Sequence, residues 1–179
     1  MALSSSIFKV YLNLVNLDHN IYDDLSLTIA LHPSETEERM MMRLAAYIIS
    51  YEPHLEFASG LSNPDEPDLW TRNLMGDVEH WIELGLPDEK KIKKALGRSE
   101  KVTVFTYNEH KASTWLEKIK SKIKKDKKLL IKQIKIKDKE VVHRITKRSM
   151  NLNALIEDES LFLSDDEYRA EITFDDEAI

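Results

Sequence analysis

Two acidic residues in this chain of 179 residues have the types and spacing of a metal site: Asp68, in the stretch EPDLW, and Glu83, in the stretch HWIELG. Enzymes that cut a phosphodiester with Mg²⁺ hold the ion on carboxylates and use a nearby lysine to stabilise charge on the attacked phosphate. Asp68 and Glu83 are therefore candidate catalytic residues and candidate ligands of Mg²⁺ or Mn²⁺. The alternative is a polar turn and a strand end, because pairs of carboxylates also arise by chance.

The strand that carries Glu83 sets the direction of its side chain. Residues 78–84, VEHWIEL, form a predicted strand, in which side chains two positions apart share one face. Glu79, Trp81 and Glu83 should then share a face, which we expect to be the polar one. If Asp68 lies on the neighbouring strand or its loop, a hard cation can bind both carboxylates and complete its shell with water and phosphate.

The lysine of such a site is missing from its usual place, because Gly85 stands two residues after Glu83 and has no side chain. The next segment, LPDEKKIKKALG, predicts a short helix that Asp88 caps. Lys91 and Lys94 lie one turn apart on this helix, and either ammonium could extend back toward Glu83. The alternative is that both are solvated charges near a helix C-terminus, where cations are mildly favoured.

Glu37 is a further candidate, at the start of a helix expected over residues 35–51. Ser34 and Glu37 have the spacing of a capping box, in which Ser34 caps the helix and Glu37 reaches back to the cap amide. The buried stripe of this helix is expected to be Met41, Leu44, Ala45 and Ile48. Glu37 lies on the same stripe, so it could assist the acidic pair or only cap the helix.

Other chemistries have weaker support in the sequence. The chain has no cysteine, which excludes disulfides, thiolate zinc sites and cysteine nucleophiles. Its six histidines are dispersed without the spacing of a zinc site, and its four glycines form no phosphate-binding loop. The tryptophans could stack on nucleic-acid bases, although aromatic residues of such domains more often belong to the core. These tryptophans are Trp70, Trp81 and Trp115.

The periodicity of apolar residues predicts a single α/β or α+β domain over residues 1–179, with a mixed central sheet flanked by helices. We expect an antiparallel N-terminal hairpin of strands at 4–16 and 21–31, followed after the first helix by an irregular loop at 57–70. Helices alternating with strands should then give parallel pairing. The remaining expected elements are a strand at 101–107, a helix at 110–124, a strand at 129–136, a helix at 138–147, and three short C-terminal strands forming an antiparallel set at one edge.

Positive charge is concentrated in one part of a chain whose formal net charge is −6. Residues 90–148 contain 21 of the 26 lysine and arginine residues, against six acidic residues. Such a segment could form a basic face that attracts the phosphates of a nucleic acid. The alternative is that the lysines only keep helix surfaces soluble.

The sequence predicts a cytoplasmic protein without a membrane segment. The N-terminal stretch MALSSSIFKVYLNL has no basic leader, no long apolar core and no cleavage signature. Apolar residues nowhere run together for about eighteen positions, the minimum for a membrane-spanning helix. The absence of cysteine fits a reducing compartment.

Several long stretches together resemble the YaeQ family of small bacterial proteins. They are HPSETEERMMMRLAAY, GLSNPDEPDLW, WIELGLPDEKKIKKA, FTYN and SMNLNALIEDESLFLSD, which span nearly the whole chain. The resemblance implies a fold of the PD-(D/E)XK nuclease type with a variant topology. It also implies a link to transcription elongation.

Carried over to this sequence, the resemblance makes Pro67 and Asp68 the PD element and Glu83 the second acid, while Gly85 occupies the usual lysine position. One hypothesis is a nuclease that depends on Mg²⁺ or Mn²⁺, with the lysine relocated to the following helix and Glu37 assisting. The alternative hypothesis is a non-catalytic module that contacts nucleic acid or the transcription machinery through its basic segment. Fold alone does not decide between them.

Overall fold

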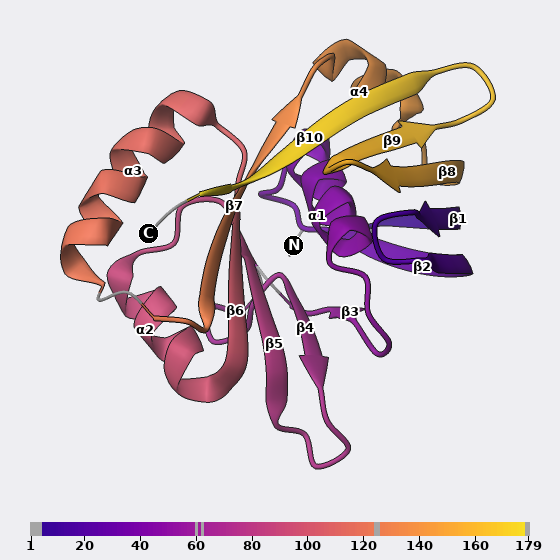
Figure 1. The fold of residues 1–179 in the computed structure, drawn as a ribbon. Coiled ribbons are helices and arrows are strands. Elements are labelled where there is room, and N and C mark those ends of the chain that lie inside the picture. The colour runs from indigo at the N-terminus through magenta and orange to yellow at the C-terminus, as the bar shows by residue number, and fades with distance from the viewer. Residues whose placement is uncertain (1–4, 60, 62, 124–125, 178–179) are drawn as a thin grey trace. The chain divides into compact units, whose positions relative to one another are not determined.

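The computed structural model describes residues 5–177 apart from residues 60, 62, 124 and 125. Within these residues it contains ten strands and four helices (Figure 1). The mixed class of helices and strands expected from the sequence is therefore confirmed. None of the described helices is both long enough and apolar enough to cross a membrane.

The chain folds into two compact units, each built from separate segments. The first unit comprises residues 1–49 and 136–174, and the second comprises residues 50–135 and 175–179. The chain thus passes from one unit to the other three times. The single domain expected over residues 1–179 stays a prediction.

The first unit contains the sheet order β2-β1-β8-β9-β10. β1 (Ser6–Asn16) and β2 (Ile21–Leu31) pair in antiparallel fashion, which confirms the N-terminal hairpin. β8 (Ser149–Glu157), β9 (Ser160–Ser164) and β10 (Arg169–Glu177) form the expected antiparallel set. Their expected place was partly wrong, because β8 pairs in parallel with β1 and extends the hairpin's sheet.

The first helix of this unit, α1 (Glu37–Ile49), is buried around most of its circumference, from Met40 to Ile48. All members of the expected stripe are buried. The predicted capping box is wrong, because the helix begins two residues later than expected. Thr36 caps it instead, with its Oγ1 accepting from the amide of Arg39 at 3.2 Å.

A buried ion pair lies beside α1 and has no counterpart in the sequence analysis. Arg43 donates from Nε and Nη2 to the two carboxylate oxygens of Glu35, at 2.8 and 2.7 Å. Its Nη2 also donates to the carbonyl oxygen of Ala30 at 2.7 Å. Arg39 adds a bond of 2.7 Å to Glu35. The otherwise apolar helix can bury an arginine because its donors are bonded.

The second helix of the first unit, α4 (Lys139–Ile145), is short and lies close to the range predicted for it. Asp138 caps it by accepting from the amides of Glu140 and Val141. This side-chain acceptor satisfies amides that have no partner inside the helix.

The second unit contains the sheet order β7-β6-β5-β4-β3. β3 (Glu56–Phe57), β4 (Leu69–Arg72) and β5 (Val78–Leu84) are antiparallel neighbours. β5, β6 (Ser99–Thr106) and β7 (Leu129–Ile136) are parallel, as the alternation of helices and strands predicted. The expected loop at 57–70 is interrupted, because Phe57 and Leu69 belong to paired strands.

Two helices make the crossovers between these parallel strands. α2 (Glu89–Arg98) connects β5 to β6, and α3 (Glu109–Lys122) connects β6 to β7. Asp88 caps α2 as predicted. Apolar residues of both helices and of β5, β6 and β7 form one core: Trp81, Ile92, Ala95, Val102, Val104, Ile119, Ile123, Leu129 and Ile131.

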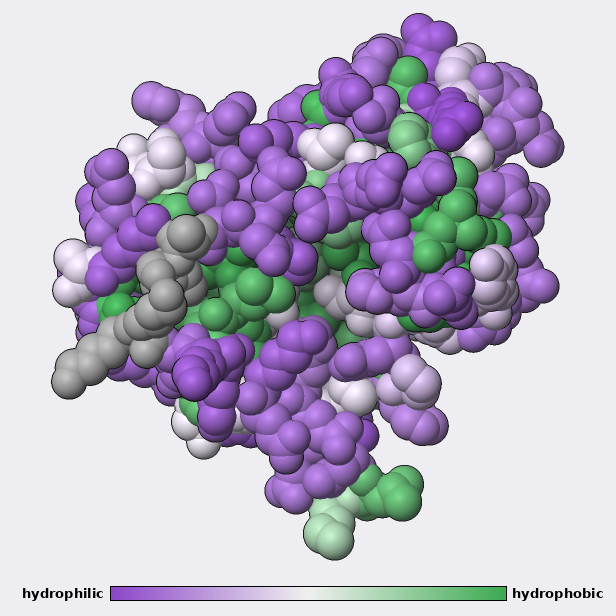
Figure 2. Space-filling view, viewed as in Figure 1, coloured by the Kyte–Doolittle hydropathy of each residue, from purple (hydrophilic) through white to green (hydrophobic). Residues whose placement is uncertain are grey.

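Hydrophilic residues cover most of the face seen in Figure 2. The turn between β4 and β5 is an exception, because Leu74 and Met75 are fully exposed there. Asn73 orders this turn, its Oδ1 accepting from the amides of Met75 and Asp77 at 2.9 and 3.0 Å.

Candidate active site

Asp68 lies directly before β4, where the backbone fixes it beside β5. Its amide donates to the carbonyl of Ile82 at 3.1 Å, and its carbonyl accepts from the amide of Ala58 at 3.0 Å. Its Oδ2 accepts from the amide of Leu84 at 2.8 Å, and only 2% of the residue is exposed. Asp68 therefore lies beside the strand of Glu83, which is the arrangement that a shared metal site would require.

Glu83 lies near the carboxyl end of β5 and is also only 2% exposed. Its Oε1 accepts from Trp81 Nε1 at 2.8 Å, and its Oε2 lies 2.7 Å from Lys91 Nζ. The expectation of a polar face is wrong, because Trp81 on the same face belongs to the apolar core under α2 and α3. Glu83 thus lies at the border of a hydrophobic core.

The second helix supplies the ammonium that pairs with Glu83. The N-cap Asp88 accepts from the amide of Lys91 at 2.8 Å, so the first turn of α2 is fixed where Lys91 can reach Glu83. Lys94 pairs with Asp65 instead. Of the two lysines considered from the sequence, the structure brings Lys91 to the acidic pair.

Burial raises the pKa of the Glu83 carboxyl. Lys91 and the indole of Trp81 act to lower it, and the charge of Asp68 acts to raise it. The net direction is upward, because a carboxylate in an apolar surrounding loses hydration that its partners only partly replace. Asp68 and Glu83 are therefore close enough for one charge to affect the other.

Gly85 explains why no lysine stands in the usual place. Its φ of +106° lies in a region that side chains rarely adopt, although an added Cβ would meet only Tyr107 Cε1, at 4.0 Å. Its amide donates to the carbonyl of Phe105 at 2.8 Å, which ties this bend to β6. A lysine here would strain the backbone, so the ammonium has to come from another element.

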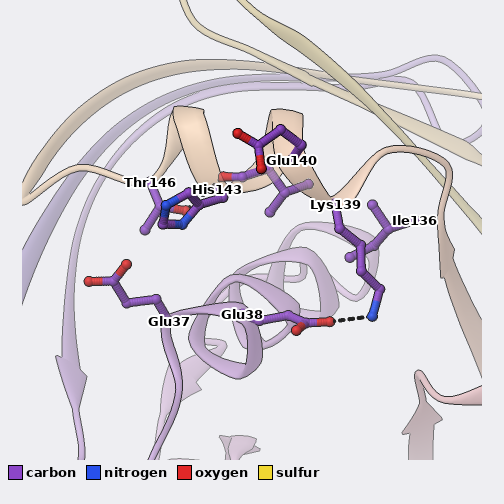
Figure 3. Close-up of a pocket in the computed structure, with 8 residues that line it drawn as sticks. Glu37, Glu38, Ile136, Lys139, Glu140, His143 and Thr146 are labelled. Atoms are coloured by element: carbon purple, nitrogen blue, oxygen red, sulfur yellow. Dashed lines mark hydrogen bonds and ion pairs between the residues drawn. The ribbon is translucent and has the colours of Figure 1, made fainter.

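Glu37 belongs to the first unit, whereas Asp68 and Glu83 belong to the second. It lies at a pocket of about 270 Å³ between the start of α1 and α4, shown in Figure 3. In this pocket Glu38 forms an ion pair of 2.7 Å with Lys139. Assistance from Glu37 to the acidic pair stays a prediction.

The donor set of Asp68 and Glu83 fits a hard divalent ion of the magnesium type. Mg²⁺ is commonly held by one or two carboxylates together with water and substrate phosphates. Within the described residues no group of three or more histidine, cysteine, aspartate or glutamate residues is placed to hold a metal. If an ion binds here, Asp68 and Glu83 would supply two ligands, and water and substrate would supply the others.

A second buried polar cluster of this unit was not found from the sequence. His80 Nδ1 lies 3.0 Å from Glu52 Oε1, and His80 Nε2 lies 2.9 Å from Thr103 Oγ1. Thr71 Oγ1 donates to the same Glu52 oxygen at 2.5 Å. The hydrogen bond from His80 is the main cause of the lowered pKa of Glu52. No spacing signal marked these residues, because they come from four separate segments.

The basic segment at 90–148 is divided between the two units at residue 135. Many of its charges are paired within their own unit, which reduces the positive field they can present. The pairs are Lys93 with Glu89, Lys132 with Asp176, Lys135 with Asp175, Lys137 with Glu171, Lys139 with Glu38 and Lys147 with Asp165. A single basic face stays a prediction.

The α+β fold and the sequence of this chain both match known proteins of one class. The model of the YaeQ family, described as YaeQ protein, matches residues 1–174. The chain belongs to the YaeQ family.

Relatives of known sequence and structure agree with this assignment. The chain is 41% identical over 172 residues to the proteins described as “Uncharacterized protein YaeQ” from Escherichia coli (strain K12) and Shigella flexneri, covering 96% of this chain and 95% of theirs. Crystal structures of YaeQ proteins from Xanthomonas axonopodis pv. citri and Pseudomonas syringae each match with a TM-score of 0.88 and 34% identity. The first match covers 97% of this chain and 98% of the other, and the second covers 98% and 97%.

Proposed function

We propose that this protein hydrolyses phosphodiester bonds with Mg²⁺ or Mn²⁺. The observation that carries the proposal is the ion pair of 2.7 Å between Lys91 Nζ and Glu83 Oε2, in a buried place that also holds Asp68. Both carboxylates are buried, Lys91 pairs with Glu83, and burying negative charge is costly. A divalent cation at this place would offset that cost.

Each side chain has a distinct role in the proposed reaction. Asp68 and Glu83 would hold the ion, which when bound polarises the phosphodiester and lowers the pKa of a water. The amide of Leu84 and the indole of Trp81 fix the two carboxylates in orientation. Lys91, with about a third of its side chain exposed, can turn from Glu83 to a phosphate oxygen as negative charge develops there.

We further propose that the second unit is a variant of the PD-(D/E)XK nuclease fold. Pro67 and Asp68 precede β4, Glu83 lies on the antiparallel neighbour β5, and a helix then leads to the parallel strand β6. This order supports the assignment. Lys91 takes the role of the lysine that Gly85 displaces.

The experiment is a cleavage assay on single- and double-stranded DNA and RNA with Mn²⁺. We expect Lys91→Ala to reduce turnover about 10²- to 10³-fold, since an ammonium directed at developing charge acts in the transition state. Mn²⁺ binding should be retained in Lys91→Ala and lost in Glu83→Gln. Lys94→Ala is the matched control, because Lys94 lies one turn further along α2 and pairs with Asp65.

Two outcomes would contradict the proposal. One is a purified wild type that cuts none of these substrates. The other is equal cutting by wild type and Glu83→Gln, which would reveal a contaminating nuclease.

The alternative is a non-catalytic module that contacts nucleic acid or the transcription machinery. It is supported by exposed lysines on α3 that form no ion pair within the described part of the chain. These lysines are Lys111, Lys118, Lys120 and Lys122. In that case Lys118→Ala and Lys122→Ala should each weaken binding modestly and equally for all sequences.

A further inference from the structure

A pocket of about 390 Å³ in the second unit lies between α3 and the carboxyl ends of β6 and β7. Ligands of α/β proteins commonly bind outside the carboxyl ends of parallel strands. The volume lies within the range of pockets that hold small organic molecules. Apolar walls come from Ala112, Trp115, Leu116 and Ile131.

One buried polar group at this pocket has no protein partner. Thr106, which lines the pocket, is 1% exposed, and its Oγ1 is the only buried side-chain nitrogen or oxygen of the described residues without a hydrogen bond. Buried polar groups almost always have a partner. A molecule in this pocket with a hydrogen-bonding edge could supply the partner that Thr106 Oγ1 lacks among the described residues.

Gln133 lies directly beside Thr106, as its partner in the parallel ladder of β6 and β7. It also lines the pocket and is only 6% exposed. Its amide can donate and accept at once, which suits the edge of a heteroaromatic ring.

The charges around the pocket argue against an anion as its occupant. Two lysines, Lys120 and Lys135, stand against three glutamates, Glu109, Glu117 and Glu177. Lys135 is moreover paired with Asp175 at 3.2 Å. The side chains around the pocket carry no net positive charge that would attract a phosphate. An uncharged ring, in contrast, would contact apolar walls and one side-chain amide.

The pocket continues the face of the sheet that carries Glu83. Glu83 pairs with Val104 in the ladder of β5 and β6, and Thr106 follows Val104 on the same face. Gln133 lies two strands from Glu83 and two residues further along, which corresponds to about 12 Å at the usual strand spacing and rise. This separation suits a base whose neighbouring phosphodiester lies at Glu83.

We propose that this pocket is a nucleobase subsite, so that the substrate of the proposed hydrolysis is a nucleic-acid strand with one base turned into the pocket. The placement of the phosphodiester rests on the proposed function. The binding of the base rests on Thr106, Gln133 and the apolar walls alone.

The test is a titration of the metal-free full chain with adenosine, guanosine, cytidine and uridine, followed by two-dimensional NMR of the backbone amides. We expect at least one nucleoside to shift the amides around Thr106, Gln133 and the facing side of α3. Gln133→Leu should lower the affinity for this nucleoside at least about tenfold, the loss expected for one buried hydrogen bond. Thr106→Val should also lower this affinity. Thr114→Val should leave it unchanged, because Thr114 is an exposed residue of α3 outside the pocket.

The two proposals fail in different ways. Glu83→Gln should abolish cleavage and leave nucleoside binding unchanged. A wild type that binds nucleosides at the pocket and cuts nothing refutes the hydrolysis while the subsite stands. No shift of the pocket amides at millimolar nucleoside, or equal binding by wild type and Gln133→Leu with an unchanged fold in the spectrum, overturns the subsite.

Discussion

Glu83 should make the stability of this protein depend on pH in a recognisable direction. Burial raises the pKa of its carboxyl above the ordinary value of 4.5, against the influence of Lys91 and Trp81. The folded state therefore binds this proton more tightly than the unfolded state, and protonation favours folding. The contribution is fully present below the unfolded-state pKa and is lost as the pH rises through the folded-state pKa.

We expect the free energy of unfolding of wild type, relative to Glu83→Gln, to fall as the pH is raised from about 4.5. Urea denaturation of both proteins across the pH range measures this difference. Glu79→Gln is the control, because Glu79 lies on the same strand and is exposed. A difference that stays constant or grows with pH would contradict the raised pKa of Glu83.

Gly85 offers a second test at the level of one residue. Gly85→Ala should destabilise the fold by about 1 to 3 kcal/mol, since its φ of +106° is unfavourable for any residue with a Cβ. Gly97→Ala in helix α2 should instead stabilise by about 0.5 to 1 kcal/mol, because nothing lies within 4 Å of the added carbon. Thermal unfolding of the two variants measures both values. Equal effects would mean that the conformation of Gly85 carries no strain.

The sequence was least informative about which side chains meet. Lys91 and Lys94 lie on neighbouring turns of one short helix, so no periodicity separates them, and only the course of α2 relative to β5 selects Lys91. Thr106 looked like any other residue of an apolar strand. Its missing hydrogen bond arises from packing between segments that the sequence pattern does not relate.

At the scale of elements, the buried pair of Glu35 and Arg43 anchors the start of α1. Glu35→Gln removes the carboxylate that pairs with the buried guanidinium of Arg43, and we expect a loss of about 3 to 5 kcal/mol in the free energy of unfolding. Glu38→Gln should cost at most about 1 kcal/mol, because its pair with Lys139 is largely exposed. Chemical denaturation compares the two. A loss below about 1 kcal/mol for Glu35→Gln would show that the pair does not hold the helix.

Elements with strong local signals were predicted well. β1, β2, β5 and β7 follow alternating apolar residues, and Asp88 marks the start of α2, because alternation and caps are local consequences of strand and helix geometry. The start of α1 was wrong because Ser34 and Thr36 compete for the same role two residues apart. Local spacing cannot decide which of them takes it.

The pairing of elements distant in sequence was the harder part. β8 alternates like an ordinary antiparallel strand, yet its partner in parallel is β1, more than 130 residues earlier. The face of β5 was also misjudged, because a strand with Glu79 and Glu83 looks polar until α2 and α3 cover it. The packing of helices on a sheet face is a tertiary feature, and the residue pattern of one strand does not encode it.

For the whole molecule, the ion pairs within each unit bear on nucleic-acid binding. Any such affinity should fall steeply with salt, because phosphate contacts release counterions. Replacing Lys118 and Lys122 by alanine should reduce the slope of log K against log salt by about one for each lost contact. Lys93→Ala is the control, because Lys93 is paired with Glu89. Titrations of labelled DNA or RNA at several salt concentrations measure the slope, and a slope near zero in wild type would exclude phosphate contacts as the source of binding.

The interleaving of the two units constrains how this chain can fold as the ribosome delivers it. β1 and β2 emerge first, but β8, the parallel neighbour of β1, follows only after residue 148. One edge of β1 therefore stays unpaired while the ribosome synthesises most of the second unit, residues 50–135. Open strand edges invite pairing with other chains. During synthesis the nascent N-terminal hairpin is thus the segment most in need of protection from aggregation, and slowed translation before residue 149 lengthens its exposure.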